Sequence, residues 1–139
     1  LSDQCCAFTT HLISRLILGE EWSGALAEAQ AELQAPELLA MLDRRNTAIE
    51  PPSTGYVVDT LEAALWAVAR TQSFEKALLA AVNLGHDADT VGAVAGQIAG
   101  ARYGMGAIPS AWLEALAQSE RIEELAGVLL AEGRKAVVC

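Results

Sequence analysis

Four glycines recur at intervals of four residues in an otherwise apolar stretch of the chain. They are Gly92, Gly96, Gly100 and Gly104, and they fall on one face of a helix predicted from about residue 90 to residue 103. In an exposed helix each glycine costs about 1 kcal/mol relative to alanine. We therefore expect the backbone of a neighbouring element to approach this face closely, which makes the helix central and buried.

Apolar residues in the rest of the chain also recur with helical spacing. The other predicted helices begin near Ser2, Ser23, Pro36, Val58, Ser73, Pro109 and Ser119, with the four serines as N-caps. No segment of useful length alternates as a strand does. The residues are 53% hydrophobic and only 5% aromatic, which favours closely packed Ala, Leu and Val. We predict one all-α domain over residues 1–139, with six to eight helices.

Charge and cysteine content narrow the possible partners and location. Acidic residues outnumber basic ones 18 to 9, and no basic stripe offsets the net charge of -9, so a nucleic-acid partner is not expected. Every apolar run is interrupted well short of the roughly 20 residues that span a membrane, and no signal peptide opens the chain. Cys5, Cys6 and Cys139 have neither metal-ligand spacing nor an even disulfide framework. We expect a soluble protein of the reducing cytoplasm.

The segment Gly85-His86-Asp87-Ala88-Asp89-Thr90 contains the clearest chemical pattern. Two carboxylates two residues apart, followed at once by a hydroxyl, provide hard oxygen donors of the kind that Mg²⁺ binds. The same residues also fit a simpler interpretation, in which Asp89 is an N-cap and Asp87 forms an Asx-turn. His86 beside them is typical of a polar surface residue. Three protein donors do not fill an octahedron by themselves.

A second candidate lies after Pro51-Pro52, where Gly55-Tyr56 precedes a predicted helix. Glycine allows a ligand to approach the backbone, and tyrosine offers both a stacking surface and a hydroxyl, so the pair could line a pocket. An equally simple interpretation is the exit of a loop with an aromatic side chain that faces the core.

The run from Leu84 to Gly104, continuing through Ile108-Pro109 to Trp112, closely resembles the C-terminal signature of the ADP-ribosylglycohydrolase family. The upstream stretch from Gly55 to Trp66 is similar to the segment that precedes this signature. The resemblance implies an all-helical fold with two Mg²⁺ ions, or Mn²⁺ in some members. These ions position ADP-ribose and a water for cleavage of the glycosidic bond to a modified side chain.

Carried over by motif, the resemblance implies that Asp87, Asp89 and Thr90 are metal ligands, with Asp89 a bridge between the two ions. Gly55, Tyr56 and His86 are implied at the substrate pocket. His86 stands where many family members have a second glycine. No catalytic residue is assigned.

Family members are longer, and their N-terminal half supplies a Gly-Asp-containing helix and a Thr-Asp-Asp-Thr-like ligand cluster. This chain has no adjacent pair of aspartates. We therefore expect the C-terminal half alone, inactive by itself, with Mg²⁺ or Mn²⁺ absent or weakly bound. Its expected partners are a second copy or a separate N-terminal-half chain, and ADP-ribose or an ADP-ribosylated protein if the site is complete. The alternative is a non-catalytic helical interaction module that self-associates through the face left by the missing half.

Overall fold

The computed structural model describes residues 1–44 and 48–137, and side chains up to residue 133. The described residues form helices joined by loops and contain no strand, which confirms the all-α prediction. Its eight α-helices and one 3-10 turn are α1 (Ser2–Ile17), α2 (Trp22–Ala31), α3 (Pro36–Arg44), α4 (Val57–Ala69), α5 (Phe74–Val82), α6 (Ala88–Tyr103), η1 (Met105–Ala107), α7 (Ser110–Ala115) and α8 (Ser119–Val137). Among these described helices, none is long and apolar enough to cross a membrane.

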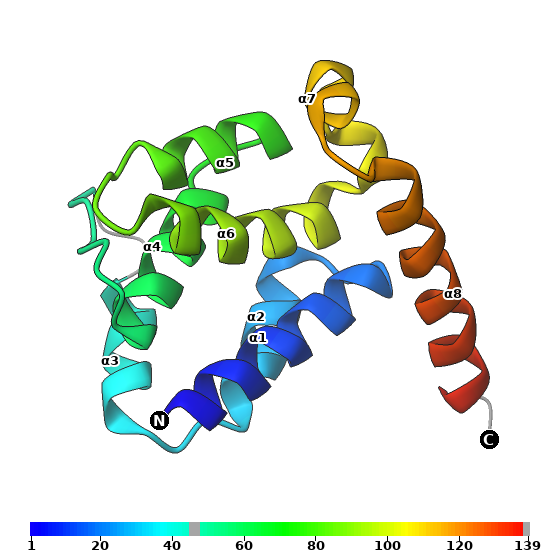
Figure 1. The fold of residues 1–139 in the computed structure, drawn as a ribbon. Coiled ribbons are helices and arrows are strands. Elements are labelled where there is room, and N and C mark those ends of the chain that lie inside the picture. The colour runs from blue at the N-terminus through cyan, green and yellow to red at the C-terminus, as the bar shows by residue number, and fades with distance from the viewer. Residues whose placement is uncertain (45–47, 138–139) are drawn as a thin grey trace. The chain divides into compact units, whose positions relative to one another are not determined.

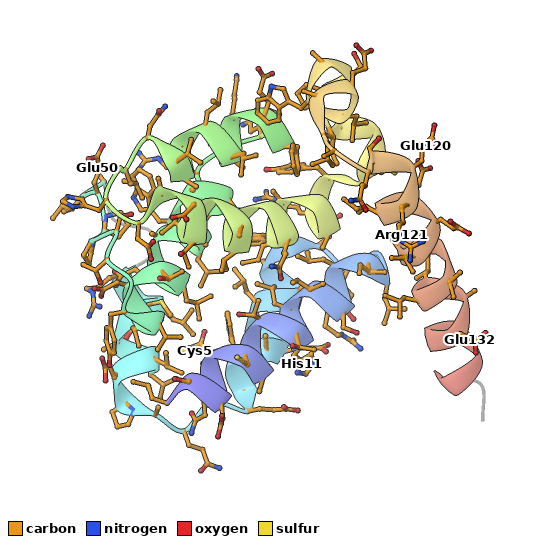
Figure 2. All side chains as sticks on the ribbon, in the orientation of Figure 1. Cys5, His11, Glu50, Glu120, Arg121 and Glu132 are labelled. Atoms are coloured by element: carbon orange, nitrogen blue, oxygen red, sulfur yellow. The ribbon has the colours of Figure 1, made fainter. Side chains whose placement is uncertain are left out.

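The helices form two compact units, one over Leu1–Ala107 and one over Ile108–Cys139. The first unit contains α1 to α6 and η1, and the second contains α7 and α8. In the second unit, charged side chains such as Glu120, Arg121 and Glu132 project from α8 (Figure 2). The expectation of a single domain over residues 1–139 remains a prediction.

Helix α6 is the central element of the first unit. It packs against α5, α4 and α1 (Figure 1). Its inward face buries Val91, Gly92, Ala95, Ile98 and Ala99, whereas other side chains of the same helix are exposed. Helix α6 is therefore central, as expected, but one of its faces is exposed to solvent rather than buried. Helix α4 is more deeply enclosed, since every residue from 60 to 68 is buried.

The glycines of α6 do not mark the close approach of a neighbouring backbone that we expected. A Cβ on Gly92 would lie 2.9 Å from Cγ1 of Val82 on α5, so this position needs glycine. A Cβ on Gly96 would meet only a leucine methyl at 3.8 Å, and one on Gly100 would meet nothing within 4 Å. Gly104 is the C-cap and has φ of +79°. The expectation of a close backbone neighbour along the whole row is therefore wrong, because α5 approaches at Gly92 and does so with a side chain.

The predicted helix starts hold to within a few residues, but three of the four predicted serine caps are wrong, and one of these three, Ser119, is the first residue of α8. Ser73 caps α5 as expected, since its hydroxyl accepts a hydrogen bond from the Lys76 N–H at 3.2 Å. Leu1 and Glu21 occupy the N-cap positions of α1 and α2, without a side-chain bond, so Ser2 and Ser23 lie inside those helices. Helix α1 begins at Ser2 itself and α2 begins one residue before Ser23, so neither serine side chain caps its helix.

Candidate functional site

The predicted ligand turn connects α5 to α6 and has a strained backbone. Gly85 and His86 have φ of +76° and +51°, both in the left-handed region. Asp87 then occupies the N-cap position of α6, which begins at Ala88. The alternative in which Asp89 is the N-cap is therefore wrong, because Asp89 lies in the first turn of the helix. Both carboxylates thus stand at the N-terminus of α6, where the helix dipole favours negative charge.

Asp87 and Thr90 interact directly at this helix start. The Thr90 hydroxyl donates to Oδ1 of Asp87 at 3.0 Å. Two adjacent oxygens around Mg²⁺, each about 2.1 Å from the ion, lie about 2.9 Å apart, so the observed separation suits a pair of neighbouring ligands. The Asp89 side chain is exposed next to them. Two carboxylates and a hydroxyl are the donor chemistry of a hard divalent cation.

The loop before α4 lies directly against this turn. A Cβ on Gly55 would lie 3.2 Å from Oδ2 of Asp87, so the absence of a side chain at Gly55 leaves room for that carboxylate. The structure therefore brings together Gly55 and Asp87, which are 32 positions apart in the sequence. The Asp87 carboxylate therefore packs against the backbone of the loop before α4.

A residue that the sequence did not single out connects the two segments. Ser53 is only 4% exposed, and its hydroxyl donates to the carbonyl of Gly85 at 2.9 Å. Its own carbonyl accepts a hydrogen bond from the Asp87 N–H at 3.2 Å. A serine after two prolines is ordinary for a loop, so no sequence signal could have found this contact.

The aromatic side chain of Tyr56 lies at the surface rather than in the core. Its side chain is 47% exposed, so the core-facing interpretation is wrong. The hydroxyl donates to Oε1 of Glu37 on α3 at 2.8 Å, and this bond to a carboxylate raises the pKa of Tyr56. The N–H of Tyr56 donates to the Thr54 hydroxyl at 3.1 Å, and that hydroxyl in turn donates to Asp59 at 2.6 Å. Hydrogen bonds therefore hold both the side chain and the backbone of Tyr56.

His86 is exposed and has the least common backbone conformation of the six candidate residues. A φ of +51° suits glycine, which agrees with the glycine that the family resemblance implies at this position. The structure thus accepts histidine there at a cost in strain, with the imidazole on the outside of the turn.

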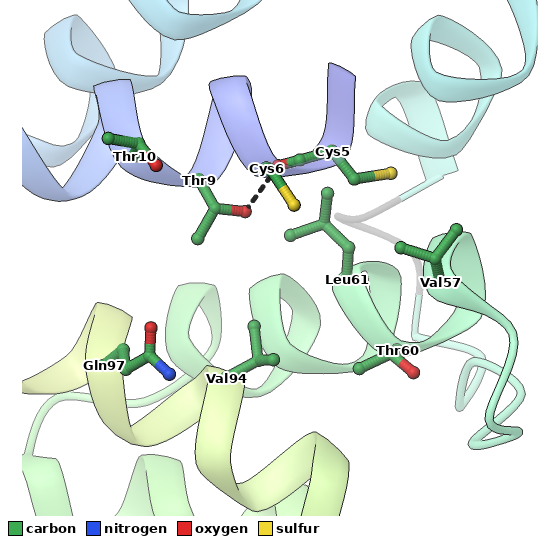
Figure 3. A pocket seen from close by; sticks show the side chains of 9 residues that line it. All are labelled: Cys5, Cys6, Thr9, Thr10, Val57, Thr60, Leu61, Val94 and Gln97. Atoms are coloured by element: carbon green, nitrogen blue, oxygen red, sulfur yellow. Dashed lines mark hydrogen bonds between the residues drawn. The ribbon is translucent and has the colours of Figure 1, made fainter. Parts of the chain in front are cut away.

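The described residues also enclose a pocket of about 250 Å³ between α1, α4 and α6 (Figure 3). Its lining is Cys5, Cys6, Thr9, Thr10, Val57, Thr60, Leu61, Val94 and Gln97. Within it the Thr9 hydroxyl donates to the Cys5 carbonyl at 2.8 Å. None of the six predicted site residues lines this pocket, so it is separate from the turn.

No group of three or more His, Cys, Asp or Glu side chains able to hold a metal is found in the part of the chain that the structure describes. The site contains Asp87, Asp89 and Thr90, which fit a cation as donors but are fewer than its usual ligands. Further donors would have to come from water, substrate or another protein segment.

A family model for ADP-ribosylglycohydrolase matches residues 2–137. The chain belongs to the ADP-ribosylglycohydrolase family. Among curated members, it is 45% identical over 123 residues to an ADP-ribosylarginine hydrolase, Tri1, of Serratia proteamaculans, a match that covers 87% of this chain and 34% of that protein. It is 36% identical over 119 residues to the ADP-ribosyl-[dinitrogen reductase] glycohydrolase of Rhodospirillum rubrum, covering 84% of this chain and 38% of that enzyme.

The same family relation is seen in three dimensions. A solved structure described as an ADP-ribosylglycohydrolase-related protein complex superposes with a TM-score of 0.77 at 43% identity. The match covers 86% of this chain and 43% of that one. The chain therefore has the ADP-ribosylglycohydrolase fold, but it spans only about a third of the length of these curated relatives.

Proposed function

We propose that this chain forms one side of the metal and substrate site of an ADP-ribosyl hydrolase, with Asp87, Asp89 and Thr90 as ligands of Mg²⁺ or Mn²⁺. The observation that carries the proposal is the geometry of the α6 N-terminus. There the Asp87 carboxylate and the Thr90 hydroxyl lie 3.0 Å apart at the positive end of a helix dipole, and the absence of a side chain at Gly55 makes room for that carboxylate. Membership in a family named for ADP-ribosyl glycoside hydrolysis supports the same function.

The residues of the turn have separable roles in this proposal. Asp87 and Asp89 supply negative charge at the mouth of the site, and Thr90 completes the set with a neutral oxygen. Gly55 lets a ligand approach the loop, and the Tyr56 ring stands exposed beside it as a stacking surface. A bound divalent cation would supply Lewis acidity and a fixed position for the ribose and for water.

The proposed substrate is an ADP-ribosylated protein. Its support is in the relatives: one is named as a hydrolase of ADP-ribosylarginine and another as acting on ADP-ribosyl-[dinitrogen reductase]. Because this chain supplies two carboxylates, we propose that by itself it binds the cation weakly and is inactive. A separate chain that carries further carboxylates would then complete the site. The free thiols of Cys5 and Cys6 support action in a reducing cytoplasm.

Calorimetry on the whole chain tests this function. We expect Mn²⁺, followed by ADP-ribose, to give weak but saturable heats, and Asp89→Ala to abolish them. Glu75→Ala is the matched control, since Glu75 is an exposed carboxylate in the first turn of α5 and lies outside the turn. Equal heats for Asp89→Ala and the unchanged chain would contradict the proposal.

A second candidate function is a non-catalytic module that self-associates. The observation in its favour is on α8, where four large apolar side chains are about half or more exposed on one helical face, namely Ile122, Leu125, Val128 and Leu129. An unpartnered apolar stripe of this kind is typical of an interaction surface. Light scattering separates the cases, because this candidate expects a dimer that Leu125→Glu and Leu129→Glu together convert to a monomer. A monomer at every concentration would exclude it.

A further inference from the structure

We propose that Ser53 is a positioning residue that holds the ligand turn in place for its metal, an inference that rests on the proposed function of that turn. Ser53 forms its hydrogen bonds to the turn with the backbone and not with the side chains of the predicted ligands. It acts through the backbone on either side of His86: its hydroxyl binds the carbonyl of Gly85, and its carbonyl binds the N–H of Asp87. Both bonds come from one residue that is 96% buried, since its exposed fraction is 4%.

The turn needs such an external hold because its own sequence opposes its conformation. Gly85 and His86 are consecutive left-handed residues, and for the histidine this region is unfavourable. Asp87 at the N-cap position has an N–H that the helix itself cannot satisfy. Ser53 accepts that N–H and at the same time fixes the carbonyl two residues earlier. The pair of bonds therefore restrains both backbone dihedrals of His86 and, with them, the direction in which the Asp87 side chain leaves the chain.

Ser53 is itself held rigidly. Pro51 and Pro52 precede it with restricted φ. After it, the Thr54 carbonyl accepts a bond from the hydroxyl of Thr60, a buried residue of α4, at 3.1 Å. A chain of hydrogen bonds thus connects Asp87, through Ser53 and the adjoining Thr54, to α4, the most enclosed helix. Two residues further on, Gly55 leaves space for the Asp87 carboxylate, so one short loop both anchors the turn and makes room for its ligand.

Residues that orient metal ligands from outside typically change metal affinity by about 10- to 100-fold when they are removed. We therefore expect Ser53→Ala to weaken Mn²⁺ binding at the turn at least about tenfold. Ser53→Thr keeps the hydroxyl donor, and we expect it to restore most of the affinity. The matched control is Thr71→Val, which removes a part-buried hydroxyl-to-carbonyl bond from Thr71 to Ala67 at the end of α4, outside the loop that holds Ser53.

The decisive measurement needs no metal. Amide hydrogen exchange by NMR reports the Asp87 N–H directly, and we expect Ser53→Ala to speed its exchange at least about tenfold while the buried Ile98 amide in α6 keeps its rate. Thr71→Val is expected to leave the Asp87 rate within about twofold of the unchanged chain. Unaltered exchange at Asp87 overturns the proposal, and so does equal acceleration at Asp87 and Ile98, which indicates loss of global stability alone.

Mn²⁺ titration of the same samples then tests the metal itself, through paramagnetic broadening of the Asp89 and Thr90 amides. Broadening in the unchanged chain, with its midpoint shifted by Ser53→Ala and not by Thr71→Val, supports the positioning role. If Mn²⁺ broadens neither amide in the unchanged chain, the proposed metal function of the turn is overturned. The exchange rates alone then decide whether Ser53 holds the turn, so the two failures are distinguishable.

Discussion

His86 is the residue whose replacement has the most direct physical consequence. A non-glycine residue in the left-handed region costs about 1–2 kcal/mol, whereas introducing glycine adds about 0.4–1 kcal/mol of unfolded-state entropy. We therefore expect His86→Gly to stabilise the fold by about 0.5–1 kcal/mol, measured by urea unfolding. Ala93→Gly, at an exposed α6 position, is the opposite control and should cost about 1 kcal/mol. Equal losses for both variants would show that φ at His86 carries no strain.

The two neighbouring cysteines should differ in reactivity. Cys5 is buried, and burial raises the pKa of its thiol above the ordinary value of 9.0, whereas Cys6 is exposed. In a Cys139→Ser background, which removes a cysteine outside the described residues, we expect iodoacetamide to modify Cys6 first at pH 8. A raised folded pKa contributes stability that is complete below pH 9.0 and is lost as the pH rises through the folded value. Tandem mass spectrometry of the modified peptide gives the order, and faster labelling of Cys5 would contradict the assignment.

At this scale the sequence predicted some features and missed others for clear reasons. Asp87 and Thr90 could be singled out as candidate ligands because their residue types and spacing are themselves the signal, and their metal binding stays a prediction. Ser53 could not, since its role depends on a hydrogen bond to Gly85, 32 positions away, that no local pattern encodes. Tyr56 was found, but its exposed orientation follows from the bond to Glu37 on α3, which is a tertiary contact.

Among the helices, the close packing of α5 against α6 depends on Gly92. A Cβ on Gly92 would lie 2.9 Å from a methyl of Val82, whose branched side chain cannot easily turn away. Overpacking costs about 1–3 kcal/mol, and the gain in helix propensity is about 1 kcal/mol. We therefore expect Gly92→Ala to destabilise the chain by up to about 2 kcal/mol in thermal or urea unfolding.

Gly100→Ala is the matched control on the same helix. A Cβ there would meet nothing within 4 Å, so only the propensity gain remains. We expect it to stabilise by about 1 kcal/mol, and a loss at Gly100 equal to that at Gly92 would contradict the packing explanation. The helix pattern itself was predictable because apolar spacing follows the helical period. The reason for each glycine was not, because it depends on which neighbour lies opposite.

For the whole molecule, the distribution of buried side chains separates the two units. All the buried apolar residues of the described chain lie between Cys5 and Ala99, within the unit Leu1–Ala107. We expect a chain that ends at Ala107 to unfold cooperatively. A loss below 1 kcal/mol would keep its midpoint within about 4–8 °C of that of the full chain. Circular dichroism measures the midpoint, and a broad, non-cooperative transition would show that α7 and α8 are needed for folding.

The contact between Ser53 and Gly85 also has a consequence for the order of folding events. It spans 32 residues that include α4 and α5, so closing it costs chain entropy before any bond is gained. Helices α4, α5 and α6 are consecutive in sequence and pack on one another, so we expect them to dock first and thereby to bring Ser53 to Gly85. We expect Ser53→Ala to raise the unfolding rate and leave the refolding rate unchanged in stopped-flow experiments. On this view, the segment with the proposed metal ligands is the last part of the first unit to acquire its native geometry.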